Sequence, residues 1–209
     1  FAQVPPIKYA KKMGYYVVAC DQNKKSPGFK YCDESYIIST TNKKKIYELS
    51  KKLKINGIIT YVSDTASPAV SYVAKKLNLK GLPIKAVNTL VYKNLFRKFL
   101  KKNNFNYPEF KIFRSKEKIN NFIDKIGYPF FIKPIDSSGS KGVTKVVKKI
   151  FIKKAISEAL NYSKKKKFII ERIIERKGYQ VAGDGFVMNK KLVFRCWGDE
   201  HFNERLNGL

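Results

Sequence analysis

Residues 128–147 constrain the fold of this chain more than any other stretch. They read YPFFIKPIDSSGSKGVTKVV: an apolar run, a polar loop rich in Gly and Ser, and a second run of β-branched residues. That order predicts a strand, a flexible loop and a strand. The two glycines and three serines of the loop can expose several backbone N–H groups, which binding a polyphosphate requires. Lys133, at the end of the first run, can place a compact positive charge beside the phosphates.

The loop by itself leaves two interpretations open. An ordinary hairpin with a polar connection would also be rich in Gly and Ser. The loop is neither GxxxxGK[ST] nor GxGxxG, both of which lead into a helix, whereas a strand follows here. The motif F-x-K-P-x-D-S-S-G-S-x-G-V closely resembles the nucleotide loop of the ATP-grasp superfamily, in particular its carbamoyl-phosphate-synthase-like and carboxylate-amine-ligase members. This resemblance implies a set of nucleotide-binding residues: Lys133, Ser138, Gly139, Ser140 and Gly142.

A second match lies in the basic segment that follows Asn88. Its apolar residues fall on one predicted helix face and its lysines lie largely off that face, which by itself indicates a solvated basic surface. However, Tyr92-Lys-Asn-Leu-Phe-Arg97 resembles the helix that opens the ATP-grasp fold, where a lysine follows Asp or Asn. The resemblance makes Lys93 the first nucleotide-contacting lysine and Lys133 the second. Tyr92 departs from the usual acidic or amide neighbour.

The third match is Glu171-Arg-Ile-Ile-Glu175, after a predicted strand. One backbone carbonyl and one backbone N–H two residues apart can read an adenine, and Arg172 O and Ile174 N–H would supply that pair. This resembles the family hinge, in which an acidic residue precedes the two backbone contacts. The alternative is a strand end with two solvent-facing glutamates and two core isoleucines. On the resemblance, four residues are expected to bind the nucleotide: Glu171, Arg172, Ile174 and Glu175.

Predicted strands and helices alternate in residues 1–88, which indicates a parallel, Rossmann-like α/β sheet. Ligands of such sheets bind beyond the carboxyl ends of the strands. Asp21 and Asp64 follow predicted strands and could meet a substrate there, although each is equally an ordinary strand-end or capping residue. Three strands are expected in this part, at residues 15–20, 36–39 and 57–62.

The resemblance covers essentially the whole chain and implies three parts. Ala19 to Gly28, with Asp33 downstream, is similar to the domain that precedes the ATP-grasp fold. Paired strands are expected on either side of Asn189, at the start of a second lobe. The expected division is a Rossmann-like pre-ATP-grasp domain at 1–88, the first ATP-grasp lobe at 89–170, and the start of the second lobe at 171–209.

We expect the sequence to be a piece of a longer one, because it opens with a predicted helix and stops early in the second lobe. In the family, the metal ligands are acidic residues and an Asn from the later part of that lobe. No metal ligand and no catalytic residue is therefore assigned to this chain. The lone histidine, His201, lies among acidic residues and is interpreted as a surface hydrogen-bonding group.

The net charge of +28 and the pI near 10.0 would by themselves favour a nucleic acid partner. Lysine supplies 38 of the 44 basic residues, however, and the lysines are spread along the chain, with a run of four only at Lys164–Lys167. Nucleic-acid binders tend to use arginine for bidentate contacts, and this chain has six arginines. A basic nucleic-acid-binding module is therefore an alternative, as is a Rossmann-type nucleotide-binding protein without ligase activity.

The resemblance implies an ATP-dependent ligase. Members of the family use ATP with Mg²⁺ to convert a carboxylate into an acylphosphate, which an amine or another nucleophile then attacks. The expected partners are ATP and small carboxylate and amine substrates, with no membrane and with a homodimer as one possible assembly. Three cysteines without CxxC spacing indicate neither a disulfide framework nor a zinc site, so a reducing cytoplasm is the expected setting.

Overall fold

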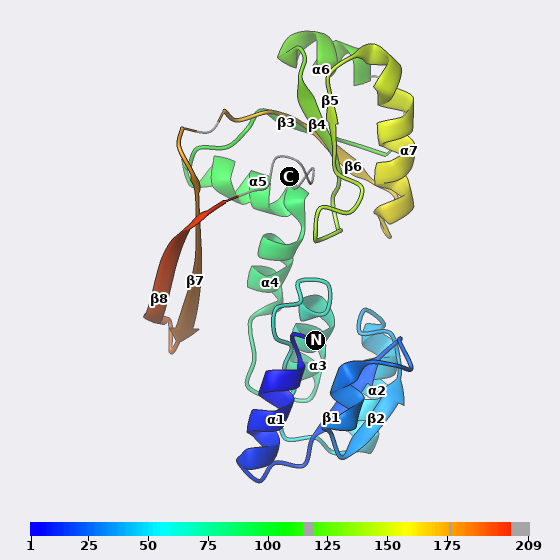
Figure 1. The fold of residues 1–209 in the computed structure, drawn as a ribbon, viewed down its shortest axis with the longest axis vertical. Coiled ribbons are helices and arrows are strands. Elements are labelled where there is room, and N and C mark those ends of the chain that lie inside the picture. Colours follow the sequence, from blue (N-terminus) through cyan, green and yellow to red (C-terminus); the bar gives the residue numbers. More distant parts are fainter. Residues whose placement is uncertain (115–118, 176, 202–209) are drawn as a thin grey trace.

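The computed structural model describes residues 1–114, 119–175 and 177–201. It shows a mixed α/β fold with a helical N-terminal part, a four-stranded sheet flanked by helices, and a two-stranded hairpin (Figure 1). Among the described residues, no helix has the length and apolar character needed to cross a membrane.

The N-terminal part contains one small parallel sheet and several short helices. Strands β1 and β2 pair from Val18↔Glu34 to Asp21↔Ile37. Helix α3 packs against both α2 and α4, and its Val73 is fully buried. The elements are α1 (Val4–Lys12), β1 (Val18–Asp21), the 3-10 helix η1 (Pro27–Lys30), β2 (Glu34–Ile37), α2 (Lys43–Lys52), α3 (Ser67–Lys76) and α4 (Ile84–Val91).

Two of the three strands expected here are confirmed with shifted ends, and the third is wrong. Residues 57–62 form no strand, and the side chains of Ile59 and Val62 are 75% and 76% exposed. Tyr61 N–H donates to Gln3 Oε1 at 3.1 Å, and Gln3 Nε2 donates to Tyr61 O. A side-chain amide thus occupies the backbone groups that a neighbouring strand would pair. An apolar, β-branched run becomes a strand only where such a neighbour is present.

The central sheet has the strand order β3-β6-β4-β5, and every neighbouring pair in it is antiparallel. Helices α6 and α7 cover one face and share a continuous apolar core with it. Helix α5 follows α4 after a break at Tyr92. The elements are α5 (Lys93–Lys102), β3 (Phe110–Phe113), α6 (Ile119–Ile126), β4 (Phe130–Pro134), β5 (Thr144–Val146), the 3-10 helix η2 (Lys149–Phe151), α7 (Ile152–Tyr162) and β6 (Phe168–Arg172).

Strand β4 shows how the sheet separates its two faces. Phe130 and Ile132 are fully buried in the core beneath α6 and α7, whereas Phe131 and Lys133 are half-buried. Because successive side chains of a strand point to opposite faces, Lys133 lies on the face away from α6 and α7. The predicted strand, loop and strand at residues 128–147 are therefore confirmed, with β4 and β5 flanking the loop.

The hairpin of β7 (Gln180–Met188) and β8 (Lys191–Glu200) confirms the paired strands expected around Asn189. Its register shifts between Phe186 and Val187. It projects from the rest of the described structure in Figure 1, and all its strand residues are exposed except Glu200.

Candidate nucleotide site

The register of β4 and β6 places a lysine beside a glutamate on one face of the sheet. Phe131 pairs with Glu171, and Lys133 pairs with Ile169. Lys133 and Glu171 are consequently diagonal neighbours, a relationship that long side chains can bridge. The Lys133 Nζ atom forms an ion pair with Glu171 Oε1. The Lys133 ammonium also lies 4.5 Å from the centre of the Phe131 ring, which attracts it further.

Helix α5 contributes a second cation to the same carboxylate. Arg97 Nε donates to Glu171 Oε2 at 2.9 Å, and Arg97 Nη2 donates to Glu171 Oε1 at 3.4 Å. Glu171 is only 2% exposed. Burial alone would raise the pKa of the Glu171 carboxyl, but the Arg97 hydrogen bond and the charges of Lys133 and Arg97 outweigh burial and hold that pKa below its usual range. Glu171 is therefore a buried anion neutralised from two elements.

Lys93 connects the start of α5 to the base of the loop between β4 and β5. Its backbone N–H donates to Ile135 O at 2.9 Å, and its Nζ donates to Ser137 O at 2.5 Å. Burial is the main cause that lowers the pKa of the Lys93 ammonium, and the nearby positive charge of Lys133 lowers this pKa further. Two lysines from different elements are thus gathered beside Glu171, at the base of the candidate phosphate loop.

The loop has an unusual backbone conformation. Gly139, Ser140 and Gly142 all have positive φ, at 61°, 54° and 73°. Ser137 Oγ donates to Lys141 O at 2.9 Å, so the loop is closed by its own contacts. Backbone in this region exposes N–H groups and can form concave anion sites.

The two glycines are required for different reasons. A Cβ at Gly139 would meet no atom within 4 Å, so the positive φ alone favours glycine there. A Cβ at Gly142 would lie 2.9 Å from Pro134 Cγ and 3.0 Å from two atoms of Tyr162. Gly142 is consequently needed for close packing as well as for its φ angle.

The predicted adenine-reading segment lies at the end of β6. Arg172 N–H donates to Glu109 O at 2.9 Å, its side chain is exposed, and Ile174 is 65% exposed. Glu175 is also exposed. The alternative of two solvent-facing glutamates and two core isoleucines is wrong, because Glu171 is buried and Ile174 is not. Adenine contact through Arg172 O and Ile174 N–H stays a prediction.

The structure thus brings Lys93, Lys133, Glu171 and the base of the loop together and leaves the segment after β6 exposed. Sequence reasoning missed Arg97 as part of the site, although Arg97 belongs to the motif that identified Lys93. Its partner lies 74 residues away, so only a family pattern could have signalled the pairing.

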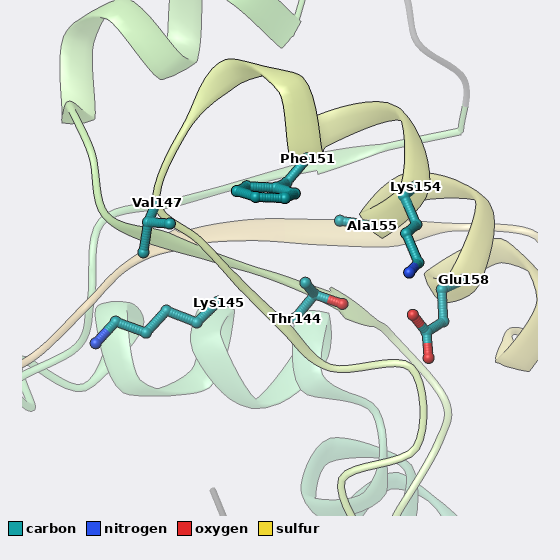
Figure 2. A pocket seen from close by; sticks show the side chains of 7 residues that line it. All are labelled: Thr144, Lys145, Val147, Phe151, Lys154, Ala155 and Glu158. Atoms are coloured by element: carbon teal, nitrogen blue, oxygen red, sulfur yellow. The ribbon is translucent and has the colours of Figure 1, made fainter. Parts of the chain in front are cut away.

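Other features of the described residues do not coincide with this site. A hollow of about 300 Å³ lies along β5 and α7, and Figure 2 shows Phe151 and Ala155 on one side of it with Lys154 and Glu158 near each other. None of the candidate nucleotide residues lines this hollow. Within residues 1–114, 119–175 and 177–201, no three His, Cys, Asp or Glu side chains gather as a metal site.

The chain is similar to one protein family and to several curated proteins. Residues 99–193 match the family described as D-ala D-ala ligase C-terminus. A 170-residue stretch is 26% identical to formate-dependent phosphoribosylglycinamide formyltransferase from Prochlorococcus marinus (strain NATL1A), covering 79% of this chain and 43% of that protein. The enzyme of the same name from Francisella tularensis is 26% identical over 169 residues, covering 79% and 44%. The chain thus spans less than half the length of these relatives.

Solved structures with the same fold include two synthetases. Phosphoribosylglycinamide synthetase from Anaerococcus prevotii superposes with a TM-score of 0.64 at 23% identity, over 97% of this chain and 50% of that chain. N5-carboxyaminoimidazole synthetase from Staphylococcus aureus superposes with a TM-score of 0.69 at 18% identity, over 97% and 53%. At these identities the likeness concerns the fold, which extends over nearly all of the chain.

Proposed function

We propose that this chain is the ATP-binding portion of an ATP-dependent carboxylate-amine ligase, or of a similar ligase, that acts through an acylphosphate. The proposal proceeds from the ATP-grasp resemblance of the sequence, which the family match and the curated relatives confirm. The observation that carries the proposal is the convergence of Lys93, from α5, and Lys133, from β4, at the base of a loop with three positive-φ residues. The loop supplies backbone donors and the lysines supply charge, which suits a polyphosphate.

The charges on this face also fit a triphosphate. Lys93, Lys133 and Arg97 provide three cationic groups, and the carboxylates of Glu171 and Asp136 compensate only part of that charge. The remaining positive charge, with its solvation reduced by burial, attracts an anion more strongly than an exposed lysine does. We infer that Lys93 and Lys133 contact the phosphates, and that Glu171 holds Lys133 in place before the nucleotide arrives.

The roles of the remaining residues follow from their positions. The backbone of Ser138, Gly139, Ser140 and Gly142 would wrap the phosphates, and the segment from Arg172 to Glu175 would meet the adenine and ribose. ATP with Mg²⁺ supplies the phosphoryl group that activates a carboxylate, and lysines and backbone N–H groups neutralise charge during such a transfer. No Mg²⁺ ligand is assigned among the described residues.

The domain division is part of the proposal. Residues 1–88 form a Rossmann-like pre-ATP-grasp domain, supported by the parallel β1–β2 pair and the helices around it. Residues 89–170 form the first ATP-grasp lobe, and residues 171–209 begin the second. A small carboxylate and an amine are the proposed co-substrates, which agrees with the formyl transfer named for the curated relatives. A homodimer and a cytoplasmic location stay predictions.

A binding comparison tests this function against the two alternatives. ATP should raise the melting temperature of the protein, whereas NAD and duplex DNA should not. A nucleic-acid module would instead bind duplex with a steep dependence on salt, and a dehydrogenase-like protein would respond to NAD. Stabilisation by DNA or NAD without stabilisation by ATP would overturn the proposal.

A further inference from the structure

Asp136, the first polar residue after β4, uses both carboxylate oxygens within the protein. Its Oδ1 accepts from Ser163 Oγ at 2.7 Å, and its Oδ2 accepts from Lys165 N–H at 2.9 Å. Ser163 and Lys165 belong to the turn between α7 and β6. The Asp136 carboxylate therefore ties the base of the candidate phosphate loop to a turn that follows it by nearly thirty residues.

Ser163 is the buried centre of this connection. It is 1% exposed, and its Oγ both donates to Asp136 and accepts from Lys167 N–H at 3.1 Å. Ile135 N–H donates in turn to Lys167 O at 3.4 Å. A buried hydroxyl with a donor and an acceptor partner fixes the geometry of both, because losing either partner leaves a polar atom unsatisfied.

The same turn reaches the start of α5. Lys165 Nζ lies 3.6 Å from the centre of the Tyr92 ring, close enough for a cation–π contact. Tyr92 is the N-cap residue of α5, and Lys93 follows it directly with its side chain on Ser137 O. One turn thus contacts both parts of the candidate site, the loop and the helix that carries the first lysine.

We propose that Asp136, Ser163, Lys165 and Tyr92 form a positioning network that holds the phosphate loop and Lys93 in register, and so sets affinity for the outer phosphates of ATP. The inference rests on the proposed function and adds to it residues that do not touch the nucleotide. Lys165, which belongs to the run of four lysines at Lys164–Lys167, would then have a structural role in addition to its surface charge. Disturbing the network should weaken recognition of the outer phosphates while leaving contacts to the nucleoside and its first phosphate in place.

Calorimetry with ATP and with AMP tests the network. Ser163→Ala, Tyr92→Leu and Lys165→Met should each weaken ATP binding about tenfold, as loss of outer-shell support typically does, and should leave AMP binding within about twofold. Tyr92→Phe keeps the ring and should behave like the parent protein. Lys153→Met removes the same charge as Lys165→Met from an exposed position on α7, and should leave both affinities unchanged.

Amide hydrogen exchange of residues 137–142 in the nucleotide-free protein gives a second readout. Exchange should be faster in Tyr92→Leu and Lys165→Met, which alter partly exposed side chains, than in Tyr92→Phe and Lys153→Met. The network would be overturned if Tyr92→Leu and Lys165→Met kept the parent's ratio of ATP to AMP affinity and the parent's exchange rates in the loop. In that case ATP binding by the parent protein, and with it the proposed function, would be unaffected. A parent protein that binds no ATP would instead overturn the proposed function.

Discussion

Arg97 Nε lies 2.9 Å from Glu171 Oε2, although the two residues are 74 positions apart in the sequence. Helix α5 carries the arginine and strand β6 carries the glutamate, so the contact joins a helix to the sheet that holds the candidate phosphate loop. Lys133 meets the other oxygen of the same carboxylate. Glu171 is consequently the anion around which the cations of the candidate nucleotide site are arranged.

Removing the Glu171 charge should destabilise the fold. Glu171→Gln keeps the size of the side chain but leaves Arg97 and Lys133 without their counter-ion, and breaking a buried ion pair from one side costs about 3 to 5 kcal/mol. Urea denaturation at neutral pH should show a lower free energy of unfolding of that order. The exposed Glu158→Gln changes the net charge equally and should fall within about 0.5 kcal/mol of the parent. Equal losses in the two variants would contradict the central role of Glu171.

The stabilisation from Glu171 should disappear in acid. The pKa of its carboxyl is lowered in the folded protein, because the Arg97 hydrogen bond and the neighbouring charges outweigh burial. The unfolded chain therefore takes up a proton first as the pH falls, so stability is present above about pH 4.3 and is lost as the pH drops toward the lower folded value. The difference in unfolding free energy between the parent and Glu171→Gln should narrow across that window. A difference that stays constant from pH 7 to about pH 3 would exclude this linkage.

The two lysines should matter for ATP binding more than their charge alone explains. Charge-assisted contacts are worth roughly 1.5 to 3 kcal/mol, so Lys93→Ala and Lys133→Ala should each weaken ATP binding by about one to two powers of ten in calorimetry.

The matched control for these variants is Lys153→Ala, from an exposed position of α7. Lys164 is unsuitable as a control because its Nζ donates to Thr41 Oγ1 at 2.5 Å, linking the turn before β6 to the N-terminal part. If Lys133→Ala and Lys153→Ala bind ATP alike, the lysines belong to the general basic surface and the nucleotide-site assignment is wrong.

Substitutions at the two loop glycines should affect the free energy of unfolding and the affinity for ATP differently. Gly142→Ala places a methyl group against Pro134 and Tyr162, and overpacking of that kind costs about 1 to 3 kcal/mol in unfolding free energy. The methyl group of Gly139→Ala would meet no neighbouring atom, so only the positive φ should lower the unfolding free energy, by about 1 kcal/mol. Gly139→Val should therefore stay folded while weakening ATP binding, because a bulky, β-branched residue shifts the loop backbone. Parent-like ATP affinity in a folded Gly139→Val would argue against a backbone cradle.

Local patterns predicted most of the elements correctly. The strand, loop and strand at residues 128–147 follow from an apolar run, a Gly- and Ser-rich loop and a β-branched run, and all three are present. Helix α2 begins after Asn42, a residue type that favours the N-cap, and the Asn42 side chain accepts from Lys45 N–H. Residues 57–62 looked equally strand-like, yet they form none, because a strand needs a hydrogen-bonding neighbour that a local pattern cannot supply.

The sequence by itself thus determined the order of the elements around the loop and singled out Lys93 and Lys133 as candidate nucleotide-binding lysines, because both inferences depend on residues close together in the chain. Only the tertiary structure decided the surroundings of these lysines. The register of β4 and β6 brings Lys133 diagonal to Glu171, and the path of α5 brings Arg97 to the same carboxylate. Such contacts depend on strand register and helix packing, which the core beneath α6 and α7 stabilises and which no single segment encodes.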